Sequence, residues 1–180
     1  MPLAKVQGEY SYADYLTWPE DERWEIIDGT AYLQAVPSPL HQEVLTELLT
    51  QIHQQFSGKT CRSYPAPFCV RLAEKDQEDK NIKMVVEPDI TIVCDQSKVV
   101  AKGYHGVPDM IIEIISPASI KMDRFFKFNA YETVGVREYW IVEPEGCGAD
   151  VSANRPWRDS SLRCLSAYNY VCNDRFTRPL

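Results

Sequence analysis

The stretch Met110-Ile111-Ile112-Glu113-Ile114-Ile115 decides the fold, because it predicts a strand that is buried on both faces. Four isoleucines and a methionine without any turn residue are typical of a central strand that is covered on either side. A carboxylate at this place loses its hydration, which is costly unless a cation, a metal or a hydrogen-bond donor meets it. We therefore interpret Glu113 as a functional residue.

The sequence on either side predicts further strands and two long helices. Asp28-Gly29 joins two β-rich runs, which indicates an N-terminal β-hairpin. Ser38 and Pro39 begin a helix as its N-cap and first helical residue, and Gly135 ends a second one. The polar stretch 73–83 predicts a solvated loop. We expect hairpin strands at 23–27 and 30–36, helices at 39–56 and 120–134, and further strands at 68–72, 88–94 and 137–142.

The chain of 180 residues has the length of one domain with a real core. Its net charge of −7 argues against a nucleic-acid coat or a membrane-surface protein, but is compatible with an enzyme that has one local basic cleft. No apolar run has the length of a membrane span, and Met1–Lys5 does not begin a signal peptide. We therefore expect a cytoplasmic protein without membrane contact, and its six cysteines, which form no C-x-x-C pair, are expected to be free thiols.

The composition changes after Gly146. Residues 147–180 hold five arginines, no lysine or glutamate, and three of the six cysteines, while helix and strand periodicity fade. We therefore predict a first domain at 1–146 and an atypical tail at 147–180. The tail is either an irregular extension or the product of a shifted reading frame, and it is uninformative about function.

Asp89 is the first residue expected to lie near Glu113. It opens the apolar run Ile90–Val93, and if that strand neighbours the Glu113 strand, the two carboxylates come together. Like charges at such a distance require a shared proton or a divalent cation, and oxygen ligands suit Mg²⁺ or Mn²⁺. The alternative is an aspartate that merely caps the turn after Pro88.

Lys127 is the second such residue. It shares one face of the predicted helix with Asp123, Tyr131 and several apolar residues, so it can project toward the sheet. A lysine held beside carboxylates and a metal can orient a water nucleophile and stabilise developing phosphate charge. The alternative is a solvent-exposed Asp123–Lys127 pair with little effect on stability.

Two further residues are auxiliary candidates. His41 lies in line with the apolar residues Leu45 and Leu48, so it faces inward near the helix start, either as a ligand or as a hydrogen-bonded core residue. Glu25 lies in an otherwise apolar strand. There it is either an acid that supports the site or a charge on an edge strand.

Several segments together carry a family resemblance: Arg23–Gly29, Pro37-Ser38 with His41, Glu87-Pro88-Asp89, Val107–Pro117, Asp123-Arg124 with Lys127 and Tyr131, and Gly135–Pro144. In this order they resemble the Uma-two-type family of restriction-endonuclease-like proteins, formerly a domain of unknown function and common in cyanobacteria. The resemblance implies the PD-(D/E)-x-K nuclease fold, an α/β (α+β) architecture with a mixed central sheet flanked by helices. In this sequence the predicted N-terminal β-hairpin precedes the mixed central sheet.

The resemblance also implies roles for the candidate residues. Asp89, Glu113 and Lys127 would be catalytic, and Asp89, Glu113 and the main-chain carbonyl of Ile114 would bind the metal. The sequence departs from the superfamily pattern at Ile115, where a lysine is expected, and Lys127 on the following helix is its natural substitute. Auxiliary roles fall to His41, Glu25, Asp123 and Tyr131.

The function implied is a Mg²⁺-dependent (or Mn²⁺-dependent) endonuclease that hydrolyses phosphodiester bonds of DNA. Lys121, Arg124 and Lys127 would supply affinity for phosphate. The competing hypothesis is a non-catalytic binding or assembly protein that uses the nuclease fold, and the missing strand lysine favours it. We further expect a homo-oligomer, most simply a homodimer, although the tail departs from the strands that usually follow in this family.

Overall fold

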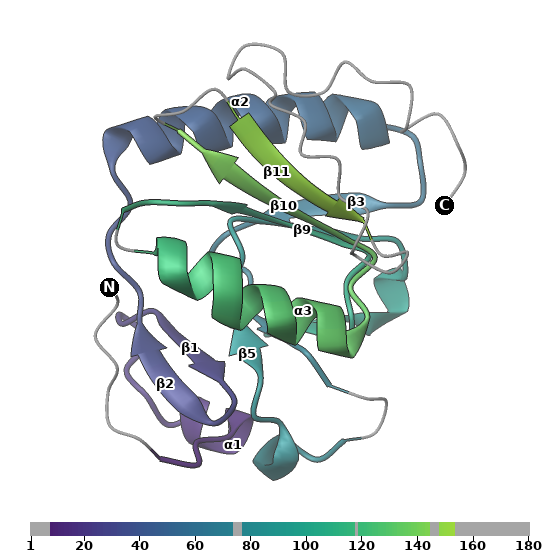
Figure 1. Cartoon of the computed structure of the whole chain (residues 1–180). Coiled ribbons are helices and arrows are strands. Elements are labelled where there is room, and N and C mark those ends of the chain that lie inside the picture. The colour runs from purple at the N-terminus through teal and green to yellow at the C-terminus, as the bar shows by residue number, and fades with distance from the viewer. Residues whose placement is uncertain (1–7, 74–76, 118, 145–147, 154–180) are drawn as a thin grey trace.

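The computed structural model describes residues 8–73, 77–117, 119–144 and 148–153, the last range as backbone alone. Two mixed sheets and several helices make up the fold, with α2 and α3 on opposite sides of one sheet (Figure 1). The predicted α/β (α+β) class is confirmed, but the strands form two sheets rather than one central sheet. The helical elements are α1 (Tyr12–Tyr15), α2 (Pro39–Phe56), the π-helix η3 (Met122–Lys127), α3 (Phe128–Val134) and the 3₁₀ turns η1 (Asp79–Asn81) and η2 (Gln96–Lys98).

The first sheet has five strands, and the predicted Glu113 strand lies at its centre. This strand, β9, pairs in parallel with β10 and antiparallel with β6, in the order β11-β10-β9-β6-β3. All five residues of β9 are buried, as the isoleucine run predicts. The strands are β3 (Arg62–Pro65), β6 (Ile90–Val93), β9 (Met110–Ile114), β10 (Glu138–Glu143) and β11 (Gly148–Ala153).

Alternation along β9 divides its side chains between two cores. Met110, Ile112 and Ile114 pack with the apolar face of α2, while Ile111 and Ile115 pack on the other side with residues of η3 and α3. Since side chains of a strand alternate between its faces, Glu113 belongs to the second side. The carboxylate therefore points toward the helix that carries Lys127.

The second sheet contains the N-terminal hairpin and runs in the order β2-β1-β5-β4-β8-β7. The hairpin prediction is confirmed, with Asp28 and Gly29 both at positive φ in the turn. The strands are β1 (Trp24–Ile27), β2 (Thr30–Leu33), β4 (Val70–Arg71), β5 (Val85–Val86), β7 (Val99–Val100) and β8 (Gly103–His105).

The two long helices were predicted at the correct places. Ser38 accepts a hydrogen bond from the backbone N–H of His41 and caps α2, which ends at Phe56. The helix expected at 120–134 begins at Ile120 and ends at Val134, and Gly135 follows as its C-cap in a left-handed conformation. Its middle, however, is π-helical, a form that is rare and frequent at functional sites.

The structure contains short elements in two segments where the sequence predicts no helix or strand. The predicted solvated loop 73–83 contains η1, and Ile82 within it is 1% exposed because it packs in the core beneath α1; residues 74–76 lie outside the described ranges. The polar connection before β9 contains β7 and β8, which are too short to give a periodic signal. Beyond Gly146, Gly148–Ala153 forms the strand β11, whereas 154–180 lie outside the described residues.

The expectation of free thiols is wrong for one pair of cysteines. Cys61 and Cys94 form a disulfide. The register of β3 and β6 opposes Arg62 to Val93, so the residues that flank this pair come face to face. Cys69 is a free cysteine, and the other three cysteines lie outside the described residues.

No helix in the described part of the chain combines the length and the apolar character needed to cross a membrane.

Candidate active site

The carboxylate of Glu113 meets two donors from the helix that follows its strand. Lys127 Nζ lies 2.9 Å from Glu113 Oε1, and the Tyr131 hydroxyl donates to the same oxygen at 3.0 Å. Lys127 and Tyr131 are four residues apart on one helical face, the spacing that the sequence predicts. Glu113 is only 4% exposed, so these two contacts replace the water that the carboxylate lost.

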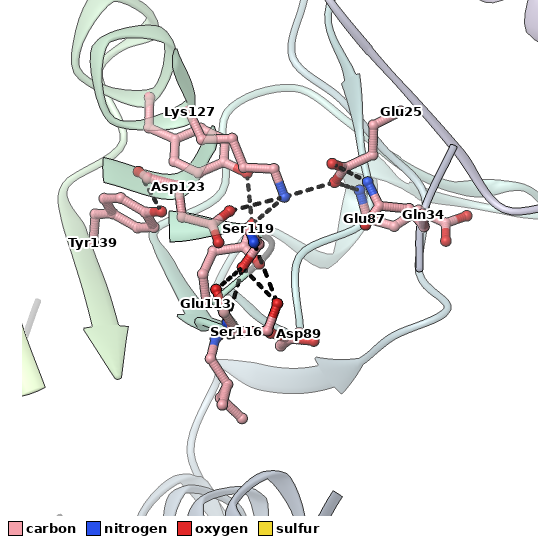
Figure 2. Close-up of polar contacts among 12 residues, drawn as sticks. Glu25, Gln34, Glu87, Asp89, Glu113, Ser116, Ser119, Asp123, Lys127 and Tyr139 are labelled. Carbon is pink, nitrogen blue, oxygen red and sulfur yellow. Dashed lines mark hydrogen bonds and ion pairs between the residues drawn. The ribbon is translucent and has the colours of Figure 1, made fainter. Parts of the chain in front are cut away.

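Lys127 lies among three carboxylates (Figure 2). Its ammonium group is 2.9 Å from Glu113, 2.9 Å from Glu25 and 3.6 Å from Asp123. The side chain is 5% exposed, which rules out the solvent-exposed Asp123–Lys127 pair considered from the sequence. The structure therefore brings together the predicted residues Glu25, Glu113, Asp123 and Lys127.

Glu25 reaches this cluster from the hairpin strand β1. Its side chain is fully buried, and its carboxylate accepts hydrogen bonds from the Glu87 backbone N–H at 2.8 Å and from the Gln34 amide. With Lys127 as a third partner, the carboxylate is held on both oxygens. Since β1 lies between β2 and β5 in its sheet, the explanation of Glu25 as a charge on an edge strand is wrong.

Asp89 and His41 form a second group at the strand ends. Asp89 Oδ2 accepts from the Ile114 backbone N–H at 2.7 Å and lies 3.1 Å from His41 Nε2. Asp89 thus does more than cap a turn, because it is fixed directly against the end of the Glu113 strand. His41 Nδ1 is buried and makes no hydrogen bond within the described part of the chain.

The charges of the cluster perturb its titration. Burial raises the pKa of the Glu113 carboxyl well above its ordinary value, against the opposing charge of Lys127. Burial likewise raises the pKa of Asp123, although the charge of Lys127 and a hydrogen bond with Ser119 act to lower it. Burial lowers the pKa of Lys127, but the three facing carboxylates outweigh it, so this pKa lies well above its ordinary value. Lys127 is therefore a cation at neutral pH.

This arrangement leaves more negative than positive charge. One ammonium faces Glu113, Glu25 and Asp123, and the charge of Asp89 also raises the pKa of Glu113. Either a proton on one carboxyl or an additional cation restores the balance. The site is thus electrostatically suited to a cation close to Glu113 and Asp89.

The fit to a divalent metal can be tested on the donor atoms. Asp89 uses Oδ2 and Glu113 uses Oε1 in hydrogen bonds, which leaves Oδ1 and Oε2 available among the described residues. Within those residues, no three His, Cys, Asp or Glu side chains are grouped as a metal cage. Mg²⁺ typically uses one or two carboxylates and keeps several waters, so this oxygen donor set fits Mg²⁺ rather than a metal that needs a cage of side chains.

A cavity of about 340 Å³ opens beside the Asp89–His41 pair. Its walls are the first turn of α2, with Ser38 and His41, and the end of β9, with Ile115 and Ser116. Glu143 at the end of β10 also lines it. This cavity gives the strand ends an approach from solvent that the buried Lys127 cluster lacks.

The predicted basic cluster is not assembled as expected. Arg124 is paired with Glu143 at 2.6 Å, Lys121 is exposed and lies over the Phe126 ring, and Lys127 is buried. Because Lys127 is buried and Arg124 is paired with Glu143, the three residues do not form one basic surface.

Three residues of the site were not proposed as functional from the sequence. Gln34 bonds to Glu25 from just beyond β2, where nothing in the local pattern marks it. Tyr139 is buried in the core, and its hydroxyl donates to the Asp123 carbonyl at 3.1 Å. Ser119 makes a hydrogen bond with Asp123, and this contact depends on the geometry of the helix start, which the sequence pattern does not specify.

The mixed sheets and the helices that cover them define a restriction-endonuclease-like fold. The model of the Uma2 family, described as "Putative restriction endonuclease", matches residues 12–156, and the chain belongs to this family.

The chain is also similar to two known proteins. The uncharacterized protein slr1290 of Synechocystis sp. is 24% identical over 153 residues, which are 83% of this chain and 75% of that protein. A crystal structure from Anabaena variabilis, described as a putative nuclease belonging to DUF820, superposes with a TM-score of 0.65 at 17% identity, covering 81% of this chain and 80% of that chain. The structural likeness supports the same fold.

Proposed function

We propose that the protein is a Mg²⁺-dependent (or Mn²⁺-dependent) endonuclease that hydrolyses DNA phosphodiester bonds. The observation that carries the proposal is the 2.9 Å contact between Lys127 Nζ and Glu113 Oε1. It supplies, from the following helix, the lysine that the nuclease pattern expects at Ile115. Membership of a family described as "Putative restriction endonuclease" supports the same class of reaction.

Asp89, Glu113 and the Ile114 carbonyl would hold the metal. When bound, Mg²⁺ would polarise the scissile phosphate and lower the pKa of a coordinated water. Because the pKa of Lys127 is raised, its ammonium stays protonated and acts as a donor and a positive charge, not as a general base. The Tyr131 hydroxyl, bound to the same carboxylate, keeps Glu113 oriented.

The test is cleavage of single-stranded and duplex DNA in Mg²⁺ or Mn²⁺. Asp89→Asn and Glu113→Gln should abolish cleavage while circular dichroism shows a native fold. Asp95→Asn is the matched control, because Asp95 caps a surface 3₁₀ turn and should retain full activity. Absence of cleavage by the wild-type protein across divalent metals contradicts the proposal.

A second function is favoured by the burial of Lys127. An ammonium that is 5% exposed and surrounded by carboxylates can serve as a structural ion pair within a non-catalytic binding or assembly protein. The two functions differ in metal binding, which stabilises a folded protein by mass action. A melting temperature that rises with Mn²⁺ in the wild type but not in Asp89→Asn favours the nuclease, and one that is unchanged in both favours the non-catalytic protein.

A further inference from the structure

A second and larger cavity, of about 700 Å³, lies between α1, the start of β1 and the turn that precedes β8. Aromatic residues dominate its walls, among them Tyr15, Trp18, Trp24 and Phe68. Its volume lies in the range of about 300–1,000 Å³ that is usual for sites of small molecules. The candidate active site makes no use of this cavity.

The aromatic walls are fixed by their own packing. The Trp18 ring lies 5.7 Å from that of Tyr15 and 5.5 Å from that of Trp24, and Phe68 stacks on Tyr64 at 4.4 Å. Tyr15, Trp18 and Phe68 are only partly buried, so part of each ring remains accessible. Rigid, accessible aromatic faces are the means by which proteins stack flat ligands such as nucleobases.

The turn before β8 closes the cavity and has little freedom to move. Gly103 has a φ of +106°, and a Cβ at this position would lie 1.9 Å from the Cys69 carbonyl oxygen. The next residue, Tyr104, donates its N–H to the same carbonyl at 2.8 Å. The backbone at Gly103 therefore packs directly against the backbone at Cys69, so this wall of the cavity is preformed.

Arg23 connects the cavity with the Asp89 site. Its Nε donates to Glu87 at 2.9 Å, while 38% of its side chain stays exposed. Tyr15 donates to the other oxygen of Glu87 at 3.2 Å. Glu87 also lines the cavity and lies two residues before Asp89 in the chain. A partly exposed cation in the cavity wall is thus bonded to a residue close in sequence to Asp89.

The cavity wall carries both acidic and basic side chains, which would orient a charged ligand. Glu20 and Glu22 line the part of the cavity formed by the segment after α1, where carboxylates can accept hydrogen bonds from amino groups of a base but repel a phosphate. Arg23, just before β1, and Lys102, in the turn before β8, also line the cavity, and their cations attract phosphate. A nucleotide whose base lies in the cavity and whose phosphate passes Arg23 toward the Asp89 site matches this distribution of charge.

We propose that the aromatic cavity binds one unpaired nucleobase of a nucleic-acid strand whose backbone runs past Arg23 to the Asp89 site. A base paired within a duplex cannot enter such a cavity, so the substrate class is single-stranded nucleic acid or a strand with a flipped-out base. The inference rests on the proposed function for its choice of a nucleic acid. Binding can nevertheless be measured without cleavage.

The experiment titrates the whole protein in EDTA with a fluorescently labelled single-stranded DNA octamer, and with the same sequence as a duplex. Anisotropy reports affinity, and tryptophan emission reports stacking, because Trp18 and Trp24 line the cavity. The single strand should bind more tightly than the duplex and should quench the emission. Phe68→Leu should weaken binding of the single strand by roughly tenfold, the loss expected for one stacking partner.

Matched variants separate the cavity from general effects on folding. Phe125→Leu makes the same change at an exposed ring outside the cavity and should leave affinity unchanged. Tyr15→Phe keeps the ring and should bind nearly as the wild type does, whereas Tyr15→Leu should not. Equal losses in Phe68→Leu and Phe125→Leu, or the absence of quenching, overturn the proposal.

The outcomes also distinguish this inference from the proposed function. Quenching and Phe68-dependent binding without any metal-dependent cleavage support the cavity but contradict the nuclease. Cleavage of duplex DNA with neither quenching nor a Phe68 effect supports the nuclease but contradicts the cavity.

Discussion

Lys127 Nζ lies 2.9 Å from Glu25 Oε1, and this contact joins the two sheets at the candidate site. Residue 25 belongs to the six-stranded sheet, whereas residue 127 belongs to the helix that covers the five-stranded one. Because the two side chains are 5% and 0% exposed, separating them leaves a buried charge unpaired. The N-terminal hairpin is therefore a structural part of the site rather than an appendage to it.

Lys127→Met should strongly destabilise the protein. It removes the single ammonium that faces Glu25, Glu113 and Asp123, and breaking a buried ion pair typically costs about 3–5 kcal/mol. Denaturation by urea at neutral pH should show this loss in the free energy of unfolding. The loss should shrink toward about pH 5, because the unpaired carboxyls can then take up protons.

Lys121→Met provides the matched control for that change. Lys121 lies on the same helix but is exposed to solvent, so its replacement should alter stability little. A similar loss in both variants would mean that the buried cluster has no special importance for stability.

The stability of the Glu113→Gln variant, relative to that of the wild type, should increase as the pH rises. Burial raises the pKa of Glu113 well above its ordinary value, so the folded state binds its proton more tightly than the unfolded state does. Its stabilising contribution is complete below the unfolded pKa and is lost as the pH rises through the folded pKa. Glutamine does not titrate, and Lys127 stays charged over this range because its pKa is also raised.

The measurement is the free energy of unfolding of both proteins from about pH 4.5 to about pH 8. Glu132→Gln, at an exposed position of α3, should show a constant difference from the wild type. A constant difference for Glu113→Gln as well would contradict the raised pKa.

The part of the site formed by β9 and the following helix could be predicted, because it depends on the periodicity of side chains within each element. The isoleucine run places Glu113 on a buried strand, and helical spacing places Asp123, Lys127 and Tyr131 on the face that meets it. The position of Glu113 within the strand even determines which face it occupies. These are relationships within one element or between two consecutive ones, which a single sequence records.

The role of Glu25 could not be derived in this way. Its contact with Lys127 depends on how the two sheets pack, and its bond to Gln34 depends on a residue beyond the end of β2. Short strands such as β5 (Val85–Val86) have no period to detect. The pairing of Cys61 with Cys94 likewise follows from the register between β3 and β6, not from cysteine spacing.

Replacing Cys61 and Cys94 together by serine should lower the stability of the protein. The disulfide joins residues separated by 33 positions, and closing a loop of this size removes unfolded-state entropy worth about 3–4 kcal/mol in the chain-entropy model. Reductant should lower the urea midpoint of the wild type toward that of the double variant. Insensitivity of the wild-type midpoint to reductant would show that the two thiols are not joined in solution.

Gly103→Ala should destabilise the protein more than Gly58→Ala does. Both glycines have positive φ, +106° and +73°, so alanine is strained at either position. A Cβ at Gly58 meets nothing within 4 Å, whereas one at Gly103 would lie 1.9 Å from the Cys69 carbonyl oxygen, which cannot yield without moving a strand. We expect a cost of about 1–2 kcal/mol at Gly58 and a clearly larger one at Gly103, measured as free energies of unfolding in urea. Equal costs would mean that the turn before β8 can shift, and the wall of the aromatic cavity would then not be preformed.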